Sequence, residues 1–216
     1  MDIIYQLFQY VTHIDTYLVA FVANYGAWTY AALFAIIFCE TGLVVTPFLP
    51  GDSLLFAAGS IAAQAGSGLS INLLFILLCL ASILGNKLNY TIGRIVGPRV
   101  FVAKSSWLLN KNHLDEAHRF YQKHGGKTII FARFLPIIRT FVPFVAGIGA
   151  MNLRSFSFYN VVSGVIWIAS LLGAGYFFGS LPIIKNNFTL VIYAIIAISV
   201  LPALFAMITR RKSVNS

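Results

Sequence analysis

The chain has 216 residues, of which 59% are hydrophobic and only 10% are charged. Water-soluble domains carry about 25% charged residues, so this composition excludes an ordinary soluble domain and indicates a membrane protein. The formal net charge is +9, but the bases gather beside apolar stretches, so no nucleic-acid partner is expected.

Four stretches contain no Asp, Glu, Lys or Arg, and each exceeds the ~20 residues that a helix needs to cross a bilayer. They are residues 16–39, 53–86, 155–184 and 186–209. Basic residues are concentrated at 94–127 and at 210–212. Because cytoplasmic loops are enriched in Lys and Arg, both regions, including the C-terminus, are expected in the cytoplasm. The start lacks the basic region of a signal peptide, so we expect the mature chain to keep it.

Residues 3–24 are predicted to form an amphipathic surface helix, because apolar residues recur at helical spacing while polar residues interrupt them. Residues 27–65 contain two apolar runs, each too short to cross a bilayer, separated by Pro47, Pro50 and Gly51. Proline interrupts a helix because it lacks an amide hydrogen and clashes with the preceding turn. We therefore predict a re-entrant hairpin over 27–65, entering and leaving on the same side of the membrane.

A full span is predicted over residues 71–93. Its polar end carries Lys87 about two helical turns before Arg94, and Lys87 is interpreted as snorkelling toward the interface. Residues 94–126 are predicted to be a basic cytoplasmic segment, in which 106–124 have the pattern of a second amphipathic helix.

A second broken segment follows at residues 127–149, where Pro136 and Pro143 predict another re-entrant hairpin. Two further spans are predicted over residues 155–178 and 188–208. The expected fold is therefore an all-α polytopic membrane protein, with the whole chain in a single membrane domain, 1–216.

The order of amphipathic helix, hairpin and span occurs twice, over about residues 3–93 and 104–180, before the last span closes the chain. A single span separates the two copies, so they are expected to be inverted. Inverted repeats with broken helices are typical of secondary transporters, whose binding site lies where the breaks meet. Short echoes support the repeat: Ala58-Gly59 with Ala146-Gly147, and Leu84-Gly85…Tyr90…Gly93 with Leu172-Gly173…Tyr176…Gly179.

Four ionisable side chains lie beside the predicted breaks, where a charge costs at least ~2.5–3.5 kcal/mol on insertion scales. They are Glu40, Asp52, Arg133 and Arg139. If the hairpins enter from opposite faces, the acids can approach the arginines. A guanidinium group suits phosphate, and a carboxyl group in a low-dielectric site takes up a proton more readily than in water. We therefore predict phosphate binding by the arginines and proton coupling by the acids, with a structural ion-pair network as the alternative.

The chain also contains four long motifs. They are Glu40-Thr41-Gly42, Pro47-x-x-Pro50-Gly51-Asp52, Gly85-Asn86-x-x-x-Tyr90-x-x-Gly93-Arg94 and Phe131-Ala132-Arg133-Phe134-x-Pro136-x-x-Arg139-x-x-x-Pro143-x-x-Ala146-Gly147. Together they resemble the DedA family of bacterial inner-membrane proteins over nearly the whole chain. The resemblance implies two opposed re-entrant hairpins and a role in moving lipid carriers, such as undecaprenyl phosphate, or phospholipids. It also implies that the two acids and two arginines are functional.

One position departs from the family pattern, because members often carry an acid where this chain has Asn86, followed by Lys87. A third acidic role at this position is therefore in doubt. Lys87, Tyr90 and Arg94 are predicted as secondary site residues.

The leading hypothesis is a proton-coupled transporter or flippase whose partners are an anionic lipid and protons. The alternatives are a monovalent cation/proton exchanger and a membrane scaffold without transport, in which small residues of 164–179 pack against another helix; a homo-oligomer is compatible with each. An enzyme is not expected, because all four histidines lie on predicted surface helices. No cofactor or metal is expected, since Cys39 and Cys79 lie in apolar segments without metal-ligand spacing.

Overall fold

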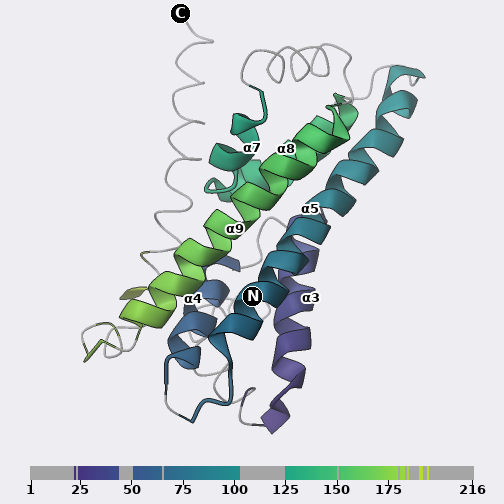
Figure 1. Ribbon diagram of the computed structural model, residues 1–216. Coiled ribbons are helices and arrows are strands. Elements are labelled where there is room, and N and C mark those ends of the chain that lie inside the picture. The colour runs from purple at the N-terminus through teal and green to yellow at the C-terminus, as the bar shows by residue number, and fades with distance from the viewer. Residues whose placement is uncertain are drawn as a thin grey trace, which may run out of the picture. The chain divides into compact units, whose positions relative to one another are not determined.

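The computed structural model describes residues 22, 24–43, 51–64, 66–102, 125–149, 151–179, 181–182, 184, 190–191 and 194. Within these ranges the regular secondary structure is helical, with no strand (Figure 1). The helices are α3 (Trp28–Gly42), α4 (Gly51–Ala62), α5 (Ile71–Val102), α7 (Lys127–Ala132), α8 (Pro136–Ile148) and α9 (Leu153–Phe178). The predicted all-α class is confirmed.

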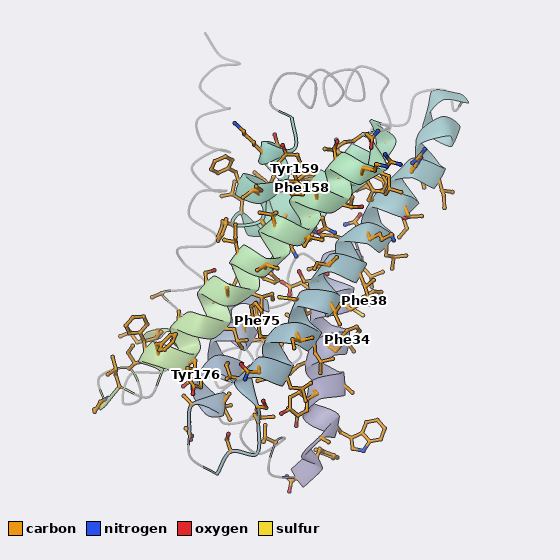
Figure 2. The ribbon with its side chains drawn as sticks, viewed as in Figure 1. Phe34, Phe38, Phe75, Phe158, Tyr159 and Tyr176 are labelled. Carbon is orange, nitrogen blue, oxygen red and sulfur yellow. The ribbon has the colours of Figure 1, made fainter. Side chains whose placement is uncertain are left out.

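Among the residues that the structure describes, two helices are long and apolar enough to cross a membrane, namely α5 over Ile71–Val96 and α9 over Leu153–Phe178. They correspond to the spans predicted at 71–93 and 155–178. Both expose large apolar side chains, as Phe158 does beside Tyr159 on α9 (Figure 2). On α5 the exposed set is Leu73, Ile76, Leu80, Leu84 and Leu88. Such a stripe at helical spacing suits contact with lipid acyl chains, because a large apolar patch is rarely left facing water.

Several predicted elements fall outside the described residues, wholly or in large part. They are the surface helix at 3–24, the basic helix at 106–124, the last span at 188–208, and Pro47 with Pro50. The two short helices α3 and α4 lie where the first hairpin was predicted, at 27–65. That they form a re-entrant hairpin stays a prediction.

Helix α5 is longer than the span predicted from the sequence. It continues past Gly93 to Val102, so the first part of the predicted cytoplasmic segment 94–126 is helical and continuous with the span. Gly93 lies inside α5, where it packs against α8. A Cβ atom at this position would collide with the backbone carbonyl of Phe144 in α8, so glycine allows the two helices to approach closely.

The second broken segment consists of α7 and α8, with the break at residues 133–135. Leu135 has an extended backbone (φ −112°, ψ 104°) and precedes Pro136, the first residue of α8. Proline disfavours the helical conformation in the residue before it, so the break is explained locally.

Pro143 was also predicted as a break residue, but it lies inside α8, which continues to Ile148. Proline at this position removes the amide that would donate to the carbonyl four residues earlier, that of Arg139. On the next carbonyl, that of Thr140, the Asn89 side chain donates a hydrogen bond at 2.7 Å. A side chain of the neighbouring helix thus contacts the backbone beside the carbonyl that Pro143 leaves without its amide donor, and the helix continues to Ile148.

The chain divides into two compact units. Unit 1 holds the described residues within Met1–Ile36, Leu49–Cys79 and Ile166–Ser216, and unit 2 holds those within Ile37–Phe48 and Leu80–Val165. In unit 1, α4 packs against α9 through two glycines. A Cβ atom on Gly59 would collide with the Leu172 carbonyl, and one on Gly175 would collide with the Phe56 carbonyl.

The α5 and α8 helices cross in unit 2 with the same arrangement. A Cβ atom on Gly147 would collide with the Tyr90 carbonyl, just as Gly93 faces Phe144. In both crossings, each glycine lies three positions after the residue of its own helix whose carbonyl faces the glycine of the other helix. When the two crossings are compared, Gly93 of α5 corresponds to Gly175 of α9. The short sequence similarity had instead aligned Gly93 with Gly179, which lies about one helical turn later.

Candidate functional site

Glu40 and Arg139 form a buried ion pair in unit 2. Arg139 Nη2 donates a hydrogen bond to Glu40 Oε1, and the side chains are 6% and 0% exposed respectively. Glu40 lies near the end of α3, and Arg139 lies in the first turns of α8 after Pro136. Removing either partner of such a pair leaves a buried charge without compensation, which costs several kcal/mol. The structure therefore brings together two of the four charged residues predicted from the sequence.

Arg133 lies in a cage of hydroxyl and amide groups, also in unit 2, and is only 3% exposed. Its Nη2 donates to Ser82 Oγ, and its Nη1 donates to Asn160 Oδ1 and Ser163 Oγ at 3.2 Å each. Gly164 adjoins the guanidinium group, since a Cβ atom there would lie 3.5 Å from Nη2, an ordinary van der Waals contact. Arg133 itself follows α7 directly at the break, so the interruption places its side chain between α5 and α9.

Asn86 extends this cage from α5. Its Nδ2 donates to Asn160 Oδ1 at 3.0 Å. With the Asn86 amide turned over, its oxygen instead accepts from Arg133 Nη1 at 2.7 Å. The oxygen and nitrogen of a side-chain amide are assigned from their hydrogen-bond partners. In the turned orientation both the oxygen and the nitrogen of the Asn86 amide have suitable partners. Asn86 thus places a neutral group within reach of an arginine.

Asn89 connects the backbones on either side of the ion pair. Its Nδ2 donates to the carbonyl of Thr41, which follows Glu40, at 3.3 Å. It also donates to the carbonyl of Thr140, which follows Arg139, at 2.7 Å. The Asn89 side chain is fully buried. Helix α5 therefore fixes the separation of α3 and α8 where the two charges meet.

Asp52 lies in unit 1, in the first turn of α4, where a carboxylate is favoured by the helix dipole. It is half-buried and accepts a hydrogen bond from Trp167 Nε1 on α9 at 3.0 Å. Trp167 is almost fully buried. The expected approach of Asp52 to the arginines stays a prediction. Gly51, predicted at the hairpin break, is the first residue of α4.

Apart from Asn86, which belongs to one of the sequence motifs, the neutral hydrogen-bond partners of these charged groups were not singled out from the sequence, although part of the signal was present. Ser82, Asn86 and Asn89 recur at i, i+4 and i+7 within an apolar span, which places them on one face of α5. Asn160 and Ser163 share a face of α9 in the same way. Polar residues that share one face of a span indicate a buried polar site.

The three secondary residues on α5 differ in their surroundings. Tyr90 is buried; its hydroxyl donates to the Met151 carbonyl at 2.5 Å, and its ring stacks on Phe156 at a centroid distance of 4.3 Å. Lys87 and Arg94 are exposed. Tyr90 therefore ties the start of α9 to α5, while the exposure of Lys87 agrees with its interpretation as a snorkelling side chain.

The arrangement in unit 2 suits competition for an anion. A guanidinium group offers parallel donors to phosphate or carboxylate, and Arg139 already directs one such donor at Glu40. A proton on Glu40 would remove its charge and weaken its hold on Arg139. Over the ranges that the structure describes, no group of three His, Cys, Asp or Glu side chains could hold a metal ion.

Comparison with known proteins places the chain among membrane proteins. Residues 49–177 match the VTT domain. The chain is 49% identical over 213 residues to Protein DedA of Escherichia coli (strain K12), covering 99% of this chain and 97% of that protein. It is 42% identical over 180 residues to a membrane protein of Mycobacterium tuberculosis (strain H37Rv), covering 83% and 79%. It is 36% identical over 156 residues to inner membrane protein YqjA of Escherichia coli (strain K12), covering 71% and 69%. No solved structure matches the chain.

Proposed function

The chain belongs to the DedA family of VTT-domain membrane proteins, and from this premise we propose that it is a proton-coupled transporter or flippase for an anionic lipid. The ligand we expect is a polyprenyl phosphate such as undecaprenyl phosphate, or a phospholipid. The proposal places the protein in the bacterial inner membrane as a multi-pass protein with a cytoplasmic C-terminus. It assigns binding and coupling to side chains and invokes no enzymatic step.

The observation that carries the proposal is the buried ion pair of Glu40 with Arg139. Charges inside a membrane protein are costly, so they are usually retained where they serve ion or substrate movement. A purely structural pair could be replaced by apolar side chains of similar volume with little loss of stability. In a pair of one titratable acid and one permanently charged base, protonation of the acid frees the base to bind another anion.

In the proposed cycle, a proton and a lipid phosphate replace each other around Arg139. Protonation of Glu40 removes the carboxylate charge that Arg139 contacts. The guanidinium group then accepts the phosphate through parallel hydrogen bonds. Release of the lipid on the other side is favoured when Glu40 loses its proton and binds Arg139 again. Asp52, in the first turn of α4, is assigned the same proton-carrying role on residue type and position.

Arg133 is assigned to the phosphate for a related reason. Its guanidinium group donates hydrogen bonds to neutral acceptors on Ser82, Asn160 and Ser163. Phosphate oxygens can replace these acceptors, and the displaced hydroxyl groups can then donate to the phosphate themselves. A ligand held by both arginines would have its charge neutralised on binding, which lowers the cost of bringing it to membrane depth.

The proposal is tested by lipid translocation in proteoliposomes that carry a labelled polyprenyl phosphate. Arg133→Ala and Arg139→Ala should each abolish translocation, because phosphate binding is lost. Removal of Arg139 alone leaves Glu40 buried without its partner, which can unfold the protein. The variant Glu40→Gln/Arg139→Gln leaves no charge at the pair, so it separates loss of phosphate binding from loss of the fold. Lys127→Gln, which removes one exposed base, is the matched control and should translocate at the wild-type rate. Wild-type rates from an Arg133→Ala/Arg139→Ala protein would refute the proposal.

Arg133→Lys separates lipid transport from monovalent cation/proton exchange. Lysine keeps the positive charge but loses the planar pair of donors. We expect at least a tenfold loss of translocation if Arg133 binds phosphate through both donors. An exchanger in which the arginine only adjusts the acids would keep its activity in this variant.

A further inference from the structure

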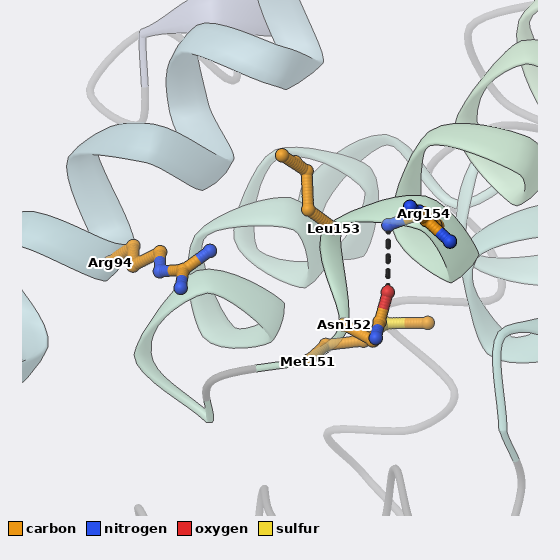
Figure 3. Close-up of a pocket in the computed structure, with 5 residues that line it drawn as sticks. All are labelled: Arg94, Met151, Asn152, Leu153 and Arg154. Carbon is orange, nitrogen blue, oxygen red and sulfur yellow. Dashed lines mark hydrogen bonds between the residues drawn. The ribbon is translucent and has the colours of Figure 1, made fainter.

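A cavity of about 530 Å³ lies at one end of the described part of unit 2. Its lining residues are Arg94, Met151, Asn152, Leu153 and Arg154 (Figure 3). Arg94 lies near the end of the candidate span Ile71–Val96, and Arg154 lies at the start of the candidate span Leu153–Phe178. The Tyr90 hydroxyl bonded to the Met151 carbonyl holds these two helix ends together. Both arginines therefore mark the same boundary between membrane and water.

The cavity carries two positive charges and has apolar edges. Both arginines are exposed, and none of the five lining residues is acidic. Met151 and Leu153 supply apolar surface beside them, and Leu153 is 42% exposed. This combination suits a ligand with an anionic group joined to an apolar body.

Tertiary contacts hold the backbone on both sides of the cavity. On one side, Gly93 and Gly147 bring α8 directly against the turn of α5 that carries Arg94. On the other side, Asn152 Oδ1 accepts the Arg154 amide hydrogen at 2.9 Å (Figure 3). Stacking of Tyr90 on Phe156 joins the two sides. A site with a rigid backbone loses less entropy on binding, which favours a specific ligand over diffuse attraction.

We propose that the Arg94–Arg154 cavity binds the phosphate monoester of an anionic lipid headgroup at the membrane surface. The two guanidinium groups would contact the phosphate oxygens, and Met151 with Leu153 would contact the start of the lipid body. A volume of about 530 Å³ is within the usual range of ligand sites, which is ~300–1,000 Å³. The inference concerns a surface site and does not depend on translocation through the buried pair.

The test measures retention of dioleoyl phosphatidic acid by the full-length protein in neutral detergent, using native mass spectrometry. Dioleoyl phosphatidylcholine, which has no net charge, is titrated in parallel. Arg94→Gln/Arg154→Gln should bind phosphatidic acid at least tenfold more weakly than wild type, with phosphatidylcholine binding unchanged. Both side chains are exposed, so the fold should persist, and an unchanged melting temperature checks this.

Lys127→Gln is the control, because it removes one positive charge from an exposed lysine outside the cavity. It is compared with Arg94→Gln and Arg154→Gln made singly, each of which also removes one charge. Lys127→Gln should bind phosphatidic acid like the wild type. Equal weakening in the control would indicate general charge attraction and overturn the proposal, as would undiminished binding by Arg94→Gln/Arg154→Gln. Complete displacement of phosphatidic acid by inorganic phosphate at equal concentration would assign the cavity to free phosphate and overturn the lipid assignment.

Discussion

At the scale of single residues, this chain stabilises buried guanidinium groups in two ways. Arg139 donates to the carboxylate of Glu40, whereas Arg133 donates to the hydroxyl and amide groups of its cage. The first arrangement binds charge to charge and can be altered by a single proton. The second holds the Arg133 guanidinium group through neutral side chains, so these hydrogen bonds do not depend on a carboxylate that can gain or lose a proton. The two arginines are therefore expected to respond differently to substitution of their neighbours.

The first prediction concerns the stability of the ion pair. Glu40→Gln leaves Arg139 charged and buried, so we expect it to lower the free energy of unfolding by about 3–5 kcal/mol. Adding Arg139→Gln should recover most of that loss, since no buried charge then remains at the pair. Unfolding in mixed detergent micelles measures both changes. Equal stability of wild type and Glu40→Gln would show that the pair is not energetically coupled.

The charged residues within the apolar chain could be recognised from the sequence, but the pairing among them could not. A charged residue beside proline and glycine in an apolar chain is rare enough to be recognised without a structure. Two acids and two arginines allow several pairings, and the choice of Glu40 with Arg139 depends on contacts across 99 positions of the chain. Trp167, the partner of Asp52, has no feature in the sequence that distinguishes it from an ordinary apolar residue.

At the scale of helices, close glycine contacts hold the short helices against the long ones. Gly59 joins α4 to α9 in unit 1, and Gly147 joins α8 to α5 in unit 2. Small residues let helix backbones approach closely, which is a main source of helix association inside membranes. Each half-length helix is thereby attached to a helix long enough to cross the bilayer.

The second prediction compares two glycines of unit 1. Gly59→Ala should lower the free energy of unfolding by about 1–3 kcal/mol, because the added methyl group meets the backbone of α9. Gly173→Ala is the control, since its new Cβ atom has open space and alanine favours the helix by about 0.5–1 kcal/mol. Thermal unfolding of the two purified variants gives the comparison. If Gly59→Ala were as stable as the control, α4 and α9 could move apart to accept the methyl group without a loss of stability, which would contradict the prediction.

The helices were easier to predict than their ends. Long uncharged runs identified α5 and α9, because a bilayer requires a minimum apolar length. The end of α5 at Val102 was not predicted, because the span was ended where the basic segment begins at Arg94, whereas the helix continues across that boundary. Likewise Pro143 has the appearance of a break until its place inside α8 is seen. Local sequence gives the propensity, and tertiary contacts decide the outcome.

At the scale of the whole molecule, the two glycine crossings have the same arrangement, and the internal repeat stays a prediction. Each crossing joins the second helix of one predicted hairpin to the long helix of the other predicted repeat. Transporters built from such repeats use the paired breaks to form one central binding site. For this chain we therefore propose that lipid and proton are exchanged at the buried charges, with the Arg94–Arg154 cavity holding lipid at the surface.

The most direct measurement is proton movement driven by lipid in proteoliposomes that contain a pH-sensitive dye and no other ion gradient. Wild-type protein should move protons when labelled polyprenyl phosphate is present and should not when it is absent. Glu40→Gln should lose the lipid-dependent proton signal, because the acid at the ion pair can no longer take up a proton. Lipid translocation by wild-type protein without any proton movement, or an undiminished proton signal from Glu40→Gln, would contradict the account.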